Sequence, residues 1–302
     1  MNEPEALILG IDCGGTHLRM GLVNSEYQVI AARVYKTQET LKGMDPVAEL
    51  ANCIRHYLHR NLPEGSKLEA IAAGFPSMVA ADRQTIIDTT FIPSLQNINV
   101  CKGLSEFNVP VFVDRDVNML LRYDAKRLEL DPSNAWLGCY IGTGLGCALA
   151  VDGKILAGRH GVAGELGHIP ARTGLHCGCG NDGCIETKTA GNTLTGIVSA
   201  EYGPEEPIDQ AFARHGSEPF MREWLDYLAQ AIATAINLLD PTAVVIGGGV
   251  PQMTDFPKDD LMDRILRMTR KPVPADDLTL LYPPVKADDG IIGAAIYARQ
   301  HR

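Results

Sequence analysis

Three cysteines and one histidine have the types and spacing of a metal site. Cys177, Cys179 and Cys184 fall within eight residues, and eight further residues separate His168 from the first of them. Three thiolates and one imidazole complete a closed tetrahedral zinc site, and glycines between the thiolates let the chain turn sharply around the ion. We therefore predict a structural zinc ion on these four side chains. His176 as a competing ligand, an open catalytic zinc, and free thiols in a loop are the alternatives.

Two glutamates bracket this loop. Glu165 lies three residues before His168, and Glu186 lies two residues after Cys184. Folding of the metal loop would bring both carboxylates to its rim, where their oxygens could accept hydrogen bonds from neighbouring hydroxyls of a sugar ring. If His168 binds the metal through one ring nitrogen, its other N–H is free to donate to a ligand or a carboxylate. The alternative is that both glutamates are solvated surface residues.

Two glycine-rich turns follow apolar runs and have the composition of phosphate-binding turns. The first contains Asp12, Gly14, Gly15 and Thr16, and the second contains Gly142, Thr143 and Gly144. Glycine lets backbone N–H groups come close to a phosphate, and each threonine adds a hydroxyl donor. Asp12 could hold Mg²⁺ against the same phosphates, directly or through water. The alternative for either turn is a tight β-hairpin without a ligand.

A third glycine-rich segment, Gly247-Gly248-Gly249, follows the apolar run 243–246. Open α/β sheets bind ligands at the carboxyl ends of their strands, and a backbone without side chains would let an adenine or a ribose lie flat on it. Gly247 and Gly248 are therefore candidate nucleotide contacts. A close crossing of a helix and a strand is the alternative.

Asp116 is our candidate for a general base. Phosphorylation of an alcohol needs a carboxylate that takes the proton of the hydroxyl. Asp116 follows the apolar run 109–113 and precedes an apparent helix over residues 117–126, so it lies where a strand gives way to a helix. Asp114 is the nearest rival, and a helix cap is the alternative role for Asp116.

Alternating strands and helices position these groups. Apolar runs predict strands over residues 6–11, 17–23, 27–35, 68–74, 109–113, 136–141, 147–151 and 243–246. Capping and helical spacing predict a helix that starts at Asp45-Pro46, and others over residues 219–239 and 290–299. The strand, glycine turn and strand pattern occurs twice, which predicts a duplicated α/β domain with one nucleotide between the halves.

Length and charge bound the organisation and the partners. A chain of 302 residues suits two domains, which we place at residues 1–115, completed by the C-terminal helix 290–302, and at residues 116–289, with the metal loop 168–186. A net charge of −10 disfavours nucleic acid and membranes as partners, so a small molecule is the default ligand. The acidic start and five scattered cysteines predict reduced thiols and a cytoplasmic location.

Five stretches of the chain together resemble the ROK family of bacterial sugar kinases and sugar-responsive repressors: DCGGT, IGTGLG, HGVAGELGHIP, CGCGNDGCIET and DPTAVVIGGGV. The similarity spans nearly the whole chain, and the cysteine cluster with GELGH is its most specific part. It implies a two-lobed, actin-like (sugar kinase/ribonuclease H-like) ATPase fold of the α/β class, with a zinc-binding loop in the second lobe. Within the family, GFPSMVAADRQTIID, RDVN, HGVAGELGHIP and INLLDP are most similar to kinases that act on D-allose.

The resemblance implies ATP-dependent phosphorylation of a hexose at its 6-hydroxyl, with Mg²⁺, by a cytoplasmic homodimer. By the same match Asp116 is the catalytic base, and the zinc ligands are His168, Cys177, Cys179 and Cys184. The implied sugar contacts are Glu165, His168 and Glu186. The implied contacts to ATP are Asp12, Gly14, Gly15, Thr16 and Thr143 for the phosphates and Gly248 for the adenosine.

Two positions depart from the family pattern, in which asparagine is frequent. Arg115 stands immediately before the base, and Thr90-Phe91 follows the strands of the first domain. Both departures disfavour glucose as the preferred sugar. Arg115 is a candidate substrate contact that would hydrogen-bond an epimeric hydroxyl or pair with Glu165. A kinase for N-acetylmannosamine, glucose or fructose, and a non-catalytic sugar sensor on the same scaffold, are the alternative functions.

Overall fold

The computed structural model describes residues 4–89 and 92–302, so Thr90-Phe91 lies outside the described residues. The chain divides into two compact units. Unit 1 comprises the described residues up to Glu129 together with Ala157–Ala163 and Lys286–Arg302, and unit 2 comprises Leu130–Leu156 and Gly164–Val285. This division differs from the boundary we placed after residue 115, because the helix that follows packs on the sheet of unit 1.

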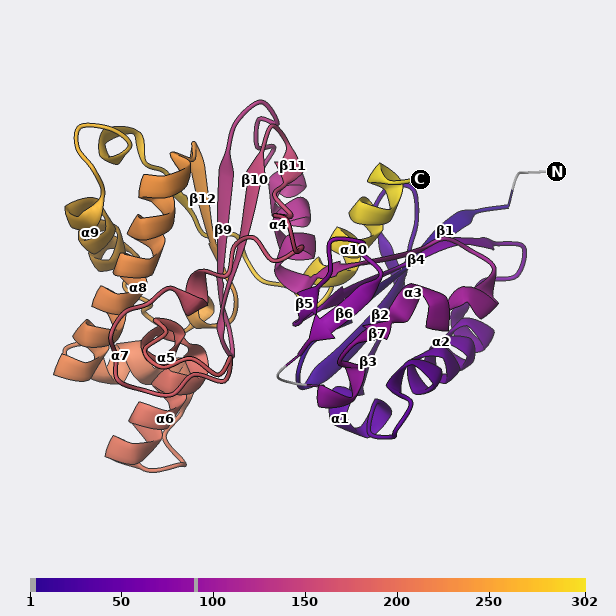
Figure 1. Cartoon of the computed structure of the whole chain (residues 1–302), viewed down its shortest axis with the longest axis horizontal. Helices are drawn as coiled ribbons and strands as arrows, with labels where there is room; N and C mark the ends of the chain where they lie inside the picture. The colour runs from indigo at the N-terminus through magenta and orange to yellow at the C-terminus, as the bar shows by residue number, and fades with distance from the viewer. Residues whose placement is uncertain (1–3, 90–91) are drawn as a thin grey trace. The chain divides into compact units, whose positions relative to one another are not determined.

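Unit 1 is built on a five-stranded sheet with the order β3-β2-β1-β4-β8 (Figure 1). Its strands are β1 (Ala6–Cys13), β2 (His17–Val23), β3 (Val29–Lys36), β4 (Lys67–Phe75) and β8 (Val111–Arg115). β2 pairs antiparallel with β1 and β3, whereas β4 pairs parallel with β1 and with β8. The carboxyl ends of β1, β4 and β8 therefore meet at one edge of the sheet.

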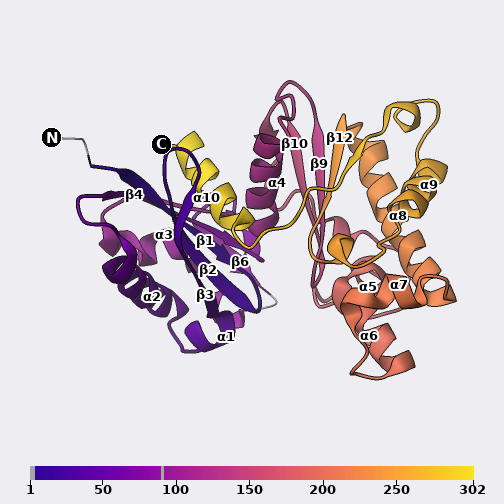
Figure 2. The same ribbon diagram turned by 180° about the vertical axis from the view of Figure 1, so that it is seen from behind.

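Helices cover both faces of this sheet (Figure 2). The three long ones are α2 (Pro46–Asn61), α4 (Asp116–Arg127) and α10 (Asp289–Gln300). Successive residues of β1 point to opposite faces, so Leu9 packs in the same cluster as residues of α2 whereas Ile8 packs with residues of α10. Gly10 lets α10 lie directly on β1, because a Cβ at this position would be 2.4 Å from Ile291 O.

Unit 1 also contains a small sheet that the sequence pattern did not predict. Its strands are β5 (Met78–Val79), β6 (Thr85–Asp88) and β7 (Ile98–Asn99), which pair antiparallel in that order. The remaining helical segments of this unit are α1 (Thr37–Thr40), η1 (Pro93–Leu95), α3 (Val100–Gly103) and η2 (Ser105–Phe107). The turn between β5 and β6 contributes to the site described below.

Unit 2 is built on a second five-stranded sheet, with the order β11-β10-β9-β12-β13. Its strands are β9 (Trp136–Ile141), β10 (Leu145–Val151), β11 (Lys154–Ile155), β12 (Ala243–Gly247) and β13 (Leu280–Leu281). Its helices are η3 (Leu166–His168), α5 (Glu186–Thr189), α6 (Gly191–Tyr202), η4 (Ile208–Gln210), α7 (Ala211–His215), α8 (Pro219–Leu239), η5 (Val250–Gln252), α9 (Lys258–Met268) and η6 (Ala275–Asp277). Trp224, Leu228 and Ile232 of α8 pack with Leu137 and Cys139 of β9 in one buried cluster.

The two sheets repeat one topology, which confirms the predicted duplication. In each, an antiparallel meander of three strands is extended by two parallel strands in the same order. The predicted bounds of α8 and β9 match the structure, because both segments are continuous apolar patterns between clear turn residues. Among the described residues, no helix is long and apolar enough to cross a membrane.

Candidate active site and metal centre

The predicted metal ligands lie together in unit 2. The side-chain nitrogen of His168 and the sulfurs of Cys177, Cys179 and Cys184 all lie within 4.8 Å of one another. Cys177 Sγ is 3.6 Å from His168 Nδ1, and Cys179 Sγ is 3.6 Å from Cys184 Sγ. Usual zinc–sulfur and zinc–nitrogen bond lengths place tetrahedral ligand atoms roughly 3.5–3.8 Å apart. The donor set and its spacing therefore fit a zinc ion.

Glycines shape the metal loop, as the sequence indicates. Gly180 and Gly183 have positive φ angles of 93° and 81°, which side chains rarely adopt, and they follow and precede ligands directly. Gly180 N also donates to Cys177 O at 2.9 Å, which closes a turn around the ion site. His176, the competing ligand, instead places Nδ1 2.9 Å from Asp182 Oδ1 on the surface. The structure therefore favours His168 as the fourth ligand.

The second ring nitrogen of His168 faces a carboxylate. His168 Nε2 lies 3.6 Å from Glu165 Oε2, and both side chains are partly exposed. A histidine that ligates through Nδ1 carries its proton on Nε2, so this N–H points towards an acceptor. The arrangement leaves Glu165 and His168 adjacent at the rim of the metal loop, as predicted.

Glu186 lies against the second glycine turn. Its Oε2 accepts a hydrogen bond from Leu145 N at 2.9 Å, and a Cβ on Gly144 would be 2.6 Å from the same oxygen. Gly191 N, at the start of α6, donates to Gly142 O at 2.9 Å. The Glu186 carboxylate therefore links the metal loop to the turn Gly142–Gly144, a contact that residue spacing does not reveal. Thr143, at the tip of this turn, is exposed.

The segment Gly247–Gly249 packs closely on β9. A Cβ on Gly247 would lie 2.7 Å from the Tyr140 ring, and one on Gly248 would lie 2.3 Å from Ile141 O. Gly248 also has a φ of 93°. Close strand packing thus explains two of the three glycines without a nucleotide, and their role as nucleotide contacts stays a prediction. Gly249 is exposed, with open space where a Cβ would be.

The first glycine turn joins β1 to β2 in unit 1. Gly14 N donates to His17 O at 2.8 Å, and Thr37 Oγ1 donates to Gly14 O at 2.7 Å, so the turn is fixed from both sides. Gly15 is half-buried and Thr16 is exposed. These features leave the turn ordered and open at its tip.

Asp12 lies beside this turn, opposite Arg19 on β2. Asp12 Oδ2 is 3.3 Å from Arg19 Nη1. Burial raises the pKa of Asp12 above its ordinary value, although the Arg19 guanidinium acts in the opposite direction. A Cβ on Gly290 would lie 2.6 Å from Asp12 Cγ, so the first turn of α10 abuts this carboxylate. The sequence did not single out Arg19 or Gly290.

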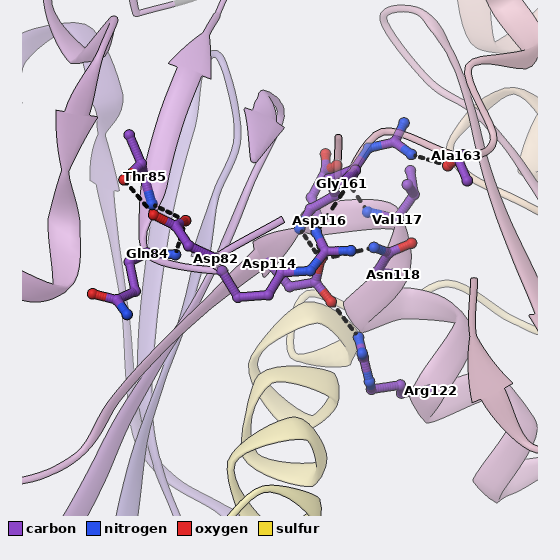
Figure 3. Close-up of polar contacts among 12 residues, drawn as sticks. Asp82, Gln84, Thr85, Asp114, Asp116, Val117, Asn118, Arg122, Gly161 and Ala163 are labelled. Atoms are coloured by element: carbon purple, nitrogen blue, oxygen red, sulfur yellow. Dashed lines mark hydrogen bonds and ion pairs between the residues drawn. The ribbon is translucent and has the colours of Figure 1, made fainter. Parts of the chain in front are cut away.

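Asp114 is a buried acceptor at the end of β8 (Figure 3). Its Oδ1 lies 2.8 Å from Asn118 Nδ2 and 2.8 Å from Arg83 Nη1, and its Oδ2 accepts from Arg122 Nη1 at 2.9 Å. With the side chain only 1% exposed, two guanidinium groups compensate its charge. Asp114 is therefore a structural carboxylate and a poor candidate for the base.

Asp116 occupies the first position of α4, where β8 ends. It is half-buried, and its Oδ1 accepts a hydrogen bond from Val117 N at 2.8 Å. Gly74, at the end of the neighbouring strand β4, makes room for the backbone, because a Cβ there would be 3.2 Å from Asp116 Cα. The strand-to-helix position that we predicted for Asp116 is confirmed, and its catalytic role stays a prediction.

Arg115, a predicted substrate contact, reaches the backbone of a distant segment. Its Nη1 donates to Ala163 O at 2.7 Å, and its side chain is buried. Arg83 Nη1 lies 3.2 Å from Gly161 O in the same segment. We call residues 157–163, which belong to unit 1, the docked loop. Its last residue precedes Glu165 by two positions.

Sequence reasoning missed Arg83, Asn118 and Arg122. Asn118 and Arg122 lie four and eight residues after Asp114, at positions that share one face of α4. This helical spacing is a signal by which the sequence could have identified them as partners of Asp114. No local signal points to Arg83, because its partner Asp114 is distant in the sequence. Predicted residues of unit 1 gather around β1, β8 and α4, and those of unit 2 gather around the metal loop and the turn Gly142–Gly144.

Comparisons with known proteins agree with this geometry. A model of the ROK family matches residues 8–301. The N-acetyl-D-glucosamine kinase of Vibrio cholerae is 28% identical over 258 residues, which cover 80% of this chain and 83% of that protein. The glucokinase of Halalkalibacterium halodurans is 28% identical over 274 residues, which cover 82% and 81%.

Solved structures show the same fold. A ROK family glucokinase from Streptomyces griseus, in complex with glucose and AMPPNP, superposes with a TM-score of 0.80 at 24% identity, covering 97% of this chain and 99% of that one. A ROK family transcriptional regulator, a homologue of the E. coli MLC protein, superposes with a TM-score of 0.84 at 24% identity, covering 99% and 79%.

The predicted fold class is therefore confirmed: this is a two-lobed α/β protein of the actin-like class with a His-Cys₃ cluster that is consistent with a zinc site. The chain belongs to the ROK family.

Proposed function

We propose that this chain is an ATP-dependent hexose kinase that phosphorylates the 6-hydroxyl of its sugar. Membership of the ROK family supports the proposal, as do curated relatives that are named as kinases of N-acetyl-D-glucosamine and of glucose. The donor groups of each unit also suit the reaction, since unit 1 contains an aspartate at the end of a strand and unit 2 contains adjacent carboxylate and imidazole groups.

The observation that carries the proposal is the contrast between two neighbouring carboxylates. Asp114 is buried and compensated by Arg83 and Arg122, so it is committed to the fold. Asp116 is half-buried at the start of α4. A base must reach the hydroxyl whose proton it takes, and only Asp116 of the pair has the exposure for this. As the 6-hydroxyl oxygen attacks the terminal phosphorus of ATP, the Asp116 carboxylate takes its proton, and the bond from that phosphorus to the bridging oxygen breaks to release ADP.

The rim of the metal loop binds the sugar in this proposal. Glu165 can accept hydrogen bonds from neighbouring ring hydroxyls, and His168 Nε2–H can donate one. Glu186 is the third candidate, although its Oε2 already accepts from Leu145 N. Zinc, when bound to His168, Cys177, Cys179 and Cys184, supplies rigidity to this rim as a closed structural site.

The glycine turns bind the nucleotide in this proposal. The backbone N–H groups of Gly15 and Gly144 and the exposed hydroxyls of Thr16 and Thr143 suit phosphate oxygens. Gly14 shapes the first turn, because its own N–H is bonded to His17 O. The Asp12 carboxylate, which lies beside Arg19, suits a magnesium ion that accompanies the phosphates. Gly142, Gly247 and Gly248 complete the set of proposed nucleotide contacts.

We propose D-allose as the preferred sugar. The support is the similarity of GFPSMVAADRQTIID, RDVN, HGVAGELGHIP and INLLDP to kinases that act on this sugar, together with Arg115 where the family often has asparagine. N-acetylglucosamine and glucose are the alternatives favoured by the names of the curated relatives. A non-catalytic sugar sensor is the alternative favoured by the structural likeness to a regulator, of which this chain covers 79%.

An ADP-release assay tests these alternatives in one experiment. The panel contains D-allose, D-glucose, D-mannose, D-fructose, D-psicose, N-acetylglucosamine and N-acetylmannosamine, and ³¹P and ¹³C NMR assign the phosphorylated position. A preference for D-allose of tenfold or more in kcat/KM, about 1.4 kcal/mol in transition-state binding, supports the substrate. Sugar binding without ADP release from any member contradicts the kinase proposal. Light scattering on the same sample tests the homodimer.

A further inference from the structure

The docked loop is held on unit 1 by charged donors. The guanidinium groups of Arg83 and Arg115 reach two of its carbonyls, Gly161 O at 3.2 Å and Ala163 O at 2.7 Å (Figure 3). Hydrogen bonds from ionised donors are roughly twice as strong as bonds between neutral groups. The loop therefore has two specific polar attachments, at residues two positions apart.

Steric fit adds to this attachment. Gly161 has a φ of 87°, and a Cβ there would lie 2.3 Å from Val79 O and 2.7 Å from Ala80 C. The backbone of the docked loop thus lies directly against the β5–β6 hairpin, with no space for a side chain. Any residue other than glycine at position 161 would push the loop away from the hairpin.

The hairpin turn presents Arg83 in a fixed direction. Arg83 has a left-handed φ of 54°, which costs free energy for a residue with a side chain. Asp82 stabilises the turn by accepting from Gln84 N and from both Thr85 N and Thr85 Oγ1. Burial alone would raise the pKa of Asp82, but these hydrogen bonds outweigh it and lower the pKa. The ionised Asp82 carboxylate thereby holds the turn in this conformation.

The same nitrogen of Arg83 joins two segments of unit 1. Arg83 Nη1 lies 2.8 Å from Asp114 Oδ1 as well as 3.2 Å from Gly161 O. Asp114 precedes the proposed base by two residues, and the docked loop ends two residues before Glu165. One guanidinium thus ties the strand that carries Asp116 to the segment that leads into the sugar rim.

We propose that Arg83 is a positioning residue for sugar binding, which acts by fixing the docked loop and thereby the start of the segment that carries Glu165. This inference rests on the proposed function for the role of Glu165. Loss of the attachment makes the loop mobile. Part of the free energy of sugar binding is then used to order the loop again, which weakens the observed affinity. The expected effect is on the affinity for the sugar, and neither the affinity for ATP nor kcat depends on this loop in the same way.

Two independent variants test the proposal. Arg83→Met removes the guanidinium and is compared with Arg83→Lys, which keeps the charge but not the planar fork. Gly161→Ala displaces the loop while leaving the Arg83–Asp114 pair in place. The matched controls are Arg55→Met, which breaks an exposed ion pair with Glu106 in the same unit, and Gly65→Ala, which has the same left-handed backbone (φ of 79°) but open space around its Cβ.

Amide hydrogen exchange is the readout that does not need activity. We expect residues 157–163 to exchange about tenfold faster or more in Arg83→Met and Gly161→Ala than in the wild type and the two controls. For the best sugar of the panel, we expect Kd by calorimetry and KM to rise about tenfold, with KM for ATP and kcat changed by less than about threefold. Arg83→Lys should recover part of both effects.

Three results would overturn the proposal. Unchanged exchange in both variants would show that the loop is held by other contacts. Faster exchange with unchanged sugar affinity would show that the loop does not position the sugar rim. Equal losses for sugar and ATP would point to general destabilisation. If the wild type releases no ADP with any sugar, the proposed kinase function fails, while exchange and sugar calorimetry still decide the role of Arg83.

Discussion

Arg122 Nη1 donates to Asp114 Oδ2 at 2.9 Å, so the helix that follows β8 reaches back to hold a carboxylate of that strand. Together with Arg83 it commits Asp114 to the fold, whereas Asp116 is half-buried at the start of α4. Because the surroundings of these two acids differ, we expect them to have different roles. Substitution of each acid should separate these roles.

Asp116→Asn should lower kcat by roughly 10²–10⁴ while sugar binding survives, because the amide keeps the shape but cannot accept the proton. Steady-state ADP release gives kcat, and calorimetry gives the sugar Kd. The melting temperature should stay close to that of the wild type. An undiminished kcat would reject Asp116 as the base.

Asp114→Asn should act mainly on stability. The substitution leaves the partly buried guanidinium groups of Arg83 and Arg122 without a compensating charge, and breaking a buried pair costs about 3–5 kcal/mol. Urea unfolding measures the change, and we expect a lower midpoint than for Asp116→Asn. The residual folded enzyme should retain a kcat within about tenfold of the wild type. A kcat loss as large as that of Asp116→Asn, with normal stability, would reverse the assignment.

Cys184→Ser should abolish zinc binding, because a structural site needs all four ligands. Metal analysis should give about one zinc per wild-type chain and close to none for the variant. We also expect a lower melting temperature and a weaker sugar Kd. His176→Ala is the matched control, since this side chain pairs with Asp182 on the surface and should keep its zinc. Loss of zinc from His176→Ala but not from His168→Ala would overturn the ligand assignment.

The second glycine turn offers a matched pair of substitutions. Gly144→Ala should destabilise the chain, because the new Cβ would lie 2.6 Å from Glu186 Oε2 and would displace this oxygen from its hydrogen bond with Leu145 N. Gly142 has open space within 4 Å, so Gly142→Ala should fold normally. If phosphate approaches this backbone, Gly142→Ala should still raise KM for ATP, at unchanged melting temperature. Normal ATP kinetics in Gly142→Ala would remove this glycine from the nucleotide site.

The acidic limb of the pH profile should depend on Arg19. Burial raises the pKa of Asp12, and Arg19 counteracts that rise. If Asp12 holds magnesium as proposed, it must be ionised to do so, and kcat/KM for ATP should fall as the pH falls through this raised pKa. Arg19→Met removes the lowering influence and should move the loss of activity to higher pH. Arg33→Met, on the exposed side of β3, is the control and should leave the profile in place. A shift to lower pH in Arg19→Met would contradict the assignment.

Much of the frame follows from local patterns. Uninterrupted apolar runs and helical spacing predict β9 and α8 to the residue, because tertiary packing does not have to override any local preference there. The strand predicted over 109–113 lies two residues further along the chain, at Val111–Arg115. The prediction ended early because Asp114 and Arg115 are charged, and charged residues usually end a buried strand. Both are buried in β8 because arginine, amide and backbone groups compensate them.

The contacts that complete the site are less accessible to sequence reasoning. The small sheet is built from strands of two to four residues, which are too short for a periodic signal. The contacts of Arg83 with Asp114 and Gly161, and of Glu186 with Leu145 N, join residues that are distant in the chain. Residue types and spacing identify Glu186 as an acid near the metal loop, but only the folded backbone reveals its contact with the glycine turn.

The two sheets share one strand order, and each copy carries a different insert between its paired strands. In the first copy, the small sheet with Arg83 is inserted between β4 and β8, and in the second copy the metal loop is inserted between β11 and β12. Both insertions leave the paired strands and their glycine turns intact. If the proposed contacts hold, the acceptor sugar could be changed by altering these two inserts together with Arg115 on β8, while the glycine turns proposed for the phosphate donor stay the same.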